Sequence, residues 1–161
     1  MNKSIAPNDH NHFHEKHACL LCESFERLTG KSLLAQDAEN VSLGKQLFEA
    51  EFVVVSHGTE ADPVFNYANQ QALRLFEMHW SEFVTLPSRL SAEPVHQDER
   101  ARLMAAVTSQ GYIDDYAGIR IAKSGKRFRI TSATVWNVID ADGAYRGQAA
   151  TFSNWACLNE S

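Results

Sequence analysis

The sequence predicts an α+β domain in which an antiparallel sheet is covered by helices. In the last third of the chain, apolar runs at residues 112–122, 127–139 and 144–155 are separated by short polar turns at 123–126 and 140–143. Each turn contains a glycine, which can adopt the positive φ that tight hairpins need. We therefore expect three consecutive antiparallel strands, and helical periodicity earlier in the chain supplies the helices.

Side chains alternate between the faces of a strand, so each of these runs divides into two sets. One set is mainly large and apolar and needs a cover: Ile119, Ile121, Phe128, Ile130, Trp136, Val138, Gln148, Ala150 and Phe152. The other set is smaller and more polar: Tyr116, Gly118, Arg120, Arg129, Thr131, Ala133, Val135, Gly147, Ala149 and Thr151. This second face either leaves room for a polar ligand or lets helices pack closely. Arg120 and Arg129 favour a ligand, because a buried guanidinium needs a partner.

The earlier part of the chain predicts helices and two more strands. Apolar positions recur at helical spacing from His12 to Leu28, and Gly30 is a natural stop for that helix. We expect this helix to cover the apolar sheet face. Residues 31–47 fit a short helix or an irregular linker. The remaining predictions are, in order, a strand within 48–57, a strand at 64–67, a helix to Phe76 capped by Asn69, a short helix capped by Ser81, a turn-rich segment at 86–94 and a helix at 97–110.

Length and charge narrow the classes of protein. A chain of 161 residues suits one domain with a modest extension. The net charge of -5, without a Lys/Arg cluster, argues against direct nucleic-acid binding. The apolar runs are too short for a membrane span, and the polar start lacks a secretion signal, so we expect a cytosolic protein. We divide the chain into a flexible start (1–11), a helical extension (12–47), the main domain (48–157) and a tail (158–161).

The first helix is rich in possible metal ligands: His10, His12, His14, His17, Cys19 and Cys22. A zinc ribbon would need a second ligand pair downstream, where the sequence offers only isolated histidines and Cys157. The favoured interpretation is a structural helix with Cys22 among apolar neighbours and the histidines facing water. No metal is assigned, and the three cysteines are expected to be reduced.

Two sets of motifs resemble known families. Residues 62–69, followed by Leu75-Phe76 and 81–83, are similar to the PAS pattern. His14-Glu15-Lys16-His17-Ala18 resembles the name-giving motif of the MEKHLA family, and further likeness is found in residues 86–94, 112–116, 127–130 and 148–153. The resemblance covers about residues 13–155. It implies a PAS-like five-stranded antiparallel sheet with short helices on one face and the N-terminal helical extension near the other.

A second likeness, to flavin-binding light sensors of the PAS superfamily, bears on the cofactor. Ser88 stands where that group has its photoadduct cysteine, and Arg89 and Arg100 match or lie near its phosphate-contacting arginines. The resemblance would place Arg120 and Thr131 at ring-binding asparagine positions, and Ala149 near the conserved glutamine. Flavin is therefore disfavoured, while an anionic ligand remains open. Haem is also disfavoured, because His96 is the only histidine close to the long helix.

The leading functional hypothesis is a non-catalytic PAS-like sensor that binds a small polar or anionic molecule between the sheet and the short helices. The expected binding residues are Arg89 and Arg100 at the mouth, Arg120, Arg129, Thr131 and Ala149 on the sheet, and Tyr67 and Trp80 as apolar walls. Arginine suits this role because its planar guanidinium forms two parallel hydrogen bonds with a carboxylate or phosphate. The alternative is a dimerisation module with a filled core, and a homodimer is expected. An enzyme ranks third, because no triad or phosphate-binding loop is apparent.

Overall fold

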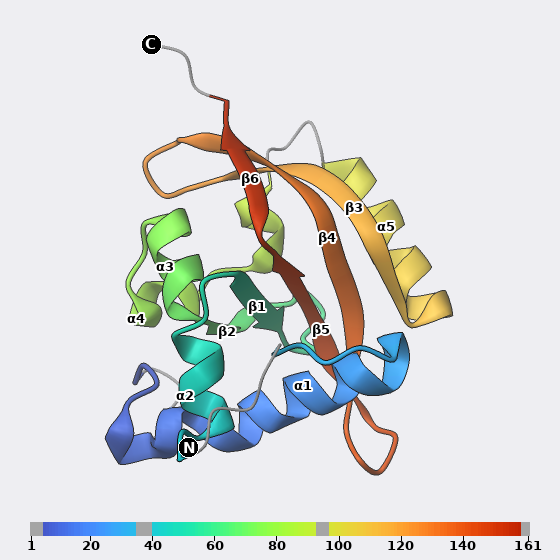
Figure 1. Cartoon of the computed structure of the whole chain (residues 1–161). Coiled ribbons are helices and arrows are strands. Elements are labelled where there is room, and N and C mark those ends of the chain that lie inside the picture. Colours follow the sequence, from blue (N-terminus) through green and yellow to red (C-terminus); the bar gives the residue numbers. More distant parts are fainter. Residues whose placement is uncertain (1–4, 35–39, 93–96, 159–161) are drawn as a thin grey trace.

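The computed structural model describes residues 5–34, 40–92 and 97–158, without the side chains of residues 97, 99, 100 and 104. Its centre is an antiparallel sheet with the order β2-β1-β5-β4-β3 (Figure 1). A sixth strand, β6, pairs with β4. The strands are β1 (Val53–His57), β2 (Phe65–Ala68), β3 (Tyr112–Ile121), β4 (Arg127–Ile139), β5 (Tyr145–Phe152) and β6 (Asn154–Cys157).

The predicted five-stranded sheet is confirmed, with one refinement at its last strand. The run expected at 144–155 is divided at Ser153. β5 pairs with the second half of β4, from Thr134 to Ile139, and β6 continues along the first half, from Phe128 to Thr131. β5 and β6 thus act as one interrupted strand on the same side of β4.

Helices lie on both faces of the sheet. They are η1 (Asp9–His14), α1 (Glu15–Thr29), α2 (Leu43–Phe48), α3 (Gln70–Phe76), α4 (Trp80–Phe83), η2 (Ser88–Ser91) and α5 (Gln97–Gln110). Figure 1 shows α5 alongside β3, while α1 crosses the sheet near the ends of β4 and β5. Two cores result. We call the one that includes Phe76, Phe128 and Phe152 the inner core, and the one that includes Leu21, Phe25 and Trp136 the outer core.

The side chains of β4 change faces partway along the strand. The predicted division into two sets is therefore wrong for β4 beyond Ser132. Phe128 and Ile130 lie in the inner core, and so does Ala133, three positions beyond Ile130 rather than two. Between them Ser132 has a φ of +55°, and the pairing of β3 with β4 is irregular nearby. Such a bulge inserts an extra residue and reverses the alternation beyond it. Trp136 therefore lies in the outer core.

The first helix covers a different surface from the one expected. The sequence predicts that it lies over Ile121, Ile130 and Phe152, but α1 packs on the opposite face, against Trp136, Val138 and Ala149. The Phe25 and Trp136 rings meet edge to face with centroids 4.9 Å apart. The Trp136 indole N–H donates to Ser24 Oγ at 3.1 Å. This helix is therefore an integral part of the fold.

Asn69 is confirmed as the N-cap of α3 and also connects three other segments. Its Oδ1 accepts from the backbone N–H groups of Ala72 and Val54, both at 3.1 Å. Its amide nitrogen donates to the carbonyls of Leu47 and Phe52. The expected cap at Ser81 is wrong, because α4 starts one residue earlier. There the His79 N–H donates to the side chain of Glu82.

The start of the chain is built around Asn8. Its side chain accepts from the N–H groups of His10 and Asn11, while Asn11 accepts from the Asn8 N–H in return. Residues 1–4 lie outside the described residues, as do residues 35–39 of the predicted linker. The flexibility expected for residues 1–11 remains a prediction.

Candidate functional site

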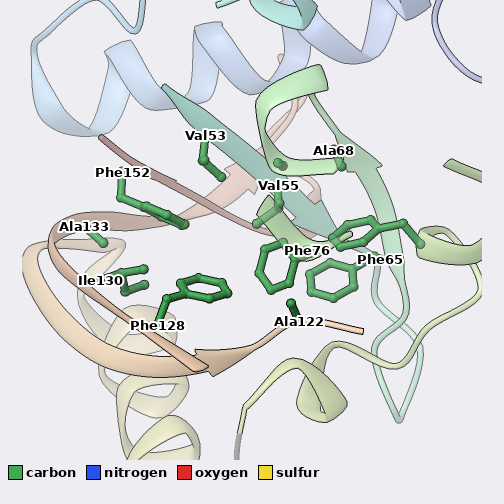
Figure 2. Packing of buried hydrophobic residues seen from close by; sticks show 12 residues of the cluster. Val53, Val55, Phe65, Ala68, Phe76, Ala122, Phe128, Ile130, Ala133 and Phe152 are labelled. Atoms are coloured by element: carbon green, nitrogen blue, oxygen red, sulfur yellow. The ribbon is translucent and has the colours of Figure 1, made fainter. Parts of the chain in front are cut away.

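A cavity of about 70 Å³ lies on the inner face of the sheet, beneath α3, η2 and α5. Most of its wall is apolar. Figure 2 shows Val55 of β1, Phe65 of β2, Phe76 of α3, Ile130 of β4 and Phe152 of β5 converging on this region from separate elements. The polar lining residues are Ser56, His57, Ser91, Tyr116, Arg120 and Gln148.

Arg120 reaches the cavity because of its register in β3. It lies opposite Phe128 of β4, which is fully buried in the inner core, so both side chains belong to the inner face. Its guanidinium lies over the Tyr116 ring, 5.3 Å from the centroid. One Nη donates to the Ile119 carbonyl at 3.1 Å. In the described part of the chain no carboxylate forms an ion pair with it.

The Tyr116 ring can lie beneath Arg120 because residue 118 is a glycine. The Tyr116 hydroxyl occupies the space that a Cβ at position 118 would need. Tyr116, Gly118 and Arg120 therefore form one unit on β3, in which the aromatic face supports the guanidinium by a cation–π contact.

At the β5 wall of the cavity lies an amide pair that sequence reasoning missed. Gln148 Nε2 donates to Asn137 Oδ1 at 3.1 Å, and Asn137 Nδ2 donates to the Val107 carbonyl of α5 at 2.9 Å. Both amides are buried. The available signal is an amide within the apolar run 148–152, but simple alternation assigns Gln148 to the face opposite the expected site.

The structure brings only some of the expected site residues together. Arg120 and Ala149 both line the cavity, and Ala149 also packs in the outer core. Arg129 and Thr131 are exposed, and Arg129 lies opposite Ile119 on the outer side of the sheet. Arg89 is exposed and forms an ion pair with Asp62 at 3.0 Å.

The remaining expected binding residues either lie away from the cavity or have a side chain that the structure does not describe. Tyr67 and Trp80 are buried in the outer core, with ring centroids 5.8 Å apart, and so do not form walls of this cavity. Tyr67 faces the outer core although Phe65, two residues before it, faces the inner core, because the pairing of β1 with β2 is irregular between Ser56 and His57. The side chain of Arg100 lies outside the described residues.

Two histidines and one cysteine of the N-terminal segment, His14, His17 and Cys22, contact the rest of the fold. His14 is buried, with Nε2 2.9 Å from the Ile5 carbonyl, and His17 Nε2 lies 3.0 Å from Ser56 Oγ. The expectation that the histidines face water is thus wrong for these two. Burial lowers the pKa of His14 and lowers that of His17 to about 4. Burial raises the pKa of Cys22, which packs against the outer core, to about 12.

A metal centre finds no support in this segment. Within residues 5–34, 40–92 and 97–158, no group of three or more histidine, cysteine and acidic side chains could hold a metal ion. Over the same residues, no helix is both long and apolar enough to cross a bilayer.

The fold defines a PAS-like domain. Solved structures that resemble it include the PAS domain of a Colwellia psychrerythraea protein, with a TM-score of 0.59 at 12% identity, covering 71% of this chain and 92% of that one. A light-oxygen-voltage domain studied with a flavin analogue gives 0.58 at 19% identity, covering 77% and 90%. The light-state dimer of the fungal photoreceptor Vivid gives 0.56 at 12% identity, covering 80% and 88%.

The chain belongs to the MEKHLA domain family, whose model matches residues 15–157. Relatives include the homeobox-leucine zipper proteins ATHB-9 of Arabidopsis thaliana, 28% identical over 144 residues, and HOX9 of Oryza sativa, 25% identical over 141 residues. Each match covers 84% of this chain but only 17% of ATHB-9 and 16% of HOX9. The chain therefore spans about one-sixth of the length of these relatives.

The residues at the cavity do not fit a flavin, the group whose analogue was used to study the light-oxygen-voltage domain. Pockets for drug-sized ligands typically measure about 300–1,000 Å³, and this cavity is much smaller, at about 70 Å³. The buried amides Asn137 and Gln148 bond to each other, and Ser88 stands in place of the reactive thiol.

Proposed function

We propose that this domain is a non-catalytic sensory module that binds a small polar or anionic molecule in the cavity beneath α3, η2 and α5. The observation that carries the proposal is Arg120. A guanidinium lines an otherwise mostly apolar cavity, and no described carboxylate neutralises it.

An anionic ligand would supply the carboxylate partner that the described residues do not provide. Removing a charge from water is costly unless opposite charge or hydrogen bonds compensate. Arg120 is partly buried, and its described partners are one backbone carbonyl and the Tyr116 ring. Arginine has five N–H donors in a fixed plane, so most of its hydrogen-bonding capacity remains for a carboxylate or a similar group.

The serines of the cavity support binding rather than catalysis. Ser91 Oγ donates to the Ser88 carbonyl at 2.7 Å, and Ser56 Oγ donates to Asn66 Oδ1 at 2.5 Å. A serine nucleophile needs a base that accepts its proton. The Ser91 proton is directed at a backbone carbonyl, which cannot act as such a base. Ser56 Oγ also lies 3.0 Å from His17 Nε2, but its proton is directed at the amide oxygen of Asn66.

Native mass spectrometry of the freshly purified chain, together with an absorbance spectrum, tests the proposal. We expect a native mass that exceeds the denatured mass by one small molecule, no visible flavin or haem band, and loss of the excess in Arg120→Met. The same spectrum gives the subunit count and tests the expected homodimer. Equal native and denatured masses, unchanged after incubation with a panel of small anionic and polar metabolites, would contradict the proposal.

A further inference from the structure

We infer that the cavity is shaped for a short-chain monocarboxylic acid, whose carboxylate pairs with Arg120 and whose alkyl chain lies among Val55, Phe76, Ile130 and Phe152. The inference rests on the proposed function and names the chemical class of its ligand. Charge, wall chemistry and volume each point to this class.

The charge of the site matches one carboxylate. Arg120 is the only permanently charged side chain among the described residues that line the cavity. A second negative charge on a dicarboxylate, or the double charge of a phosphate monoester, would lose its hydration without a matching cation among the described lining residues. The guanidinium is held over the Tyr116 ring, and its one described bond goes to the Ile119 carbonyl. Its fork can therefore bind both oxygens of a single carboxylate.

The wall beyond Arg120 favours a hydrocarbon chain. The residues that converge in Figure 2 present aromatic and aliphatic surfaces from β1, α3, β4 and β5. Hydroxyl groups of a sugar or a polyol would lose water there without replacement hydrogen bonds. Each methylene buried on such a surface improves affinity by about fourfold. Affinity is thus expected to rise with chain length until the space is filled.

The volume sets the length of that chain. The cavity, at about 70 Å³, is far smaller than the roughly 300–1,000 Å³ of pockets for drug-sized ligands, so it suits only a short chain. Butyrate and valerate have six and seven non-hydrogen atoms. Acetate leaves most of the apolar wall uncovered, and octanoate exceeds the space.

Calorimetric titration of the full chain with acetate, propionate, butyrate, valerate and octanoate tests this inference. Butyramide, butylamine and inorganic phosphate serve as chemical controls. We expect affinity to increase by about fourfold per methylene from acetate to butyrate or valerate, and to fall at octanoate. Butyramide and butylamine should bind much more weakly than butyrate.

Three variants locate the carboxylate. Arg120→Met should weaken butyrate binding by at least about thirtyfold, the loss expected for a charged contact. Arg129→Met is the matched control, because it removes an exposed arginine from the opposite face of the sheet, and it should change affinity by less than about twofold. Arg120→Lys keeps the charge without the planar fork, and it should bind butyrate more tightly than Arg120→Met does. Circular dichroism establishes that each variant is folded.

The outcomes separate the inference from the proposed function. If phosphate or another small anion binds in an Arg120-dependent manner and the monocarboxylates do not, the choice of ligand class is wrong and the proposed function stands. If butyrate binds equally well to Arg120→Met and to the unmodified chain, the assigned orientation is overturned. If no probe binds and native spectra show no retained molecule, both fail.

Discussion

His17 Nε2 and Ser56 Oγ lie 3.0 Å apart, and this hydrogen bond joins α1 to the middle of β1. Ser56 donates its own proton to Asn66 Oδ1 of β2, so its oxygen accepts the hydrogen bond from His17. The neutral His17 ring then carries its N–H at Nε2. Val55 and His57, the neighbours of Ser56 along β1, line the inner cavity. The N-terminal helix is therefore bonded to a strand that forms part of the candidate site.

The position of His17 predicts lower stability in mild acid. Burial, reinforced by the nearby charge of His14, lowers its pKa to about 4. The unfolded histidine titrates near the ordinary value of 6.5, so the unfolded chain binds more protons as the pH falls from 6.5 to 4. The free energy of unfolding should fall over this range, by at most about 3 kcal/mol from His17. Urea unfolding at several pH values measures the slope.

The variant His17→Gln isolates this contribution. It removes the titration and keeps an N–H donor, so the slope between pH 6.5 and 4 should become shallower, with a remainder from His14, whose pKa is also lowered. His10→Gln changes an exposed histidine of the same segment and should keep the original slope. Identical slopes for His17→Gln and the unmodified chain would contradict the role given to His17.

Replacing Phe25 by alanine tests whether α1 belongs to the folded core. Phe25 is 7% exposed and meets the Trp136 ring edge to face. Its loss should cost about 3–5 kcal/mol of unfolding free energy, as for other buried aromatic side chains. Urea unfolding followed by tryptophan fluorescence measures the change, with Glu26→Ala on the exposed side of α1 as the control. A cost below about 1 kcal/mol would mean that α1 is only loosely attached.

Two glycines of the β4–β5 region should respond differently to alanine. A Cβ at residue 147 would overlap the His57 carbonyl oxygen, and Gly147 has a φ of +129°. Gly143, with a φ of +86°, has no neighbour within 4 Å of the same added atom. Gly143→Ala should therefore cost about 1–2 kcal/mol, the left-handed backbone penalty alone. Gly147→Ala should separate β1 from β5 and cost much more, and equal melting temperatures for the two variants would contradict the close approach.

The sequence predicted the sheet well because alternation and turn glycines are local signals. It failed at Ser132: simple alternation puts Trp136 on the same face as Phe128, but one extra residue in β4 places the two on opposite faces. A one-residue error of register moves every later side chain to the other face. In β5 the alternation was predicted as observed, but the site was assigned to the face of Ala149, although Gln148, which shares a face with Ala150 and Phe152, also lines the cavity. Alternation also grouped Arg120 with Arg129, whereas the pairing of β3 with β4 places Arg120 opposite Phe128 on the inner face and Arg129 opposite Ile119 on the outer side. The role of Arg120 in binding stays a prediction.

Arg120→Met should leave the ligand-free protein as stable as before or more stable. The partly buried guanidinium has no described carboxylate partner, so its removal strands none of the described carboxylates and relieves a desolvation cost. If Arg120 instead formed an internal ion pair, its loss would cost about 3–5 kcal/mol. Thermal unfolding of extensively dialysed protein, with Arg129→Met as a matched surface variant, distinguishes the two results.

Backbone amide chemical shifts test whether the cavity on the inner face of the sheet is a ligand site. The isotopically labelled full chain is titrated with butyrate and, separately, with inorganic phosphate. We expect saturable shifts for butyrate at Val55, Tyr116, Arg120 and Ala150, which line the cavity, and none at the exposed Arg129 and Thr131. Shifts confined to the exposed residues, or no saturable shift with any small anion, would contradict it.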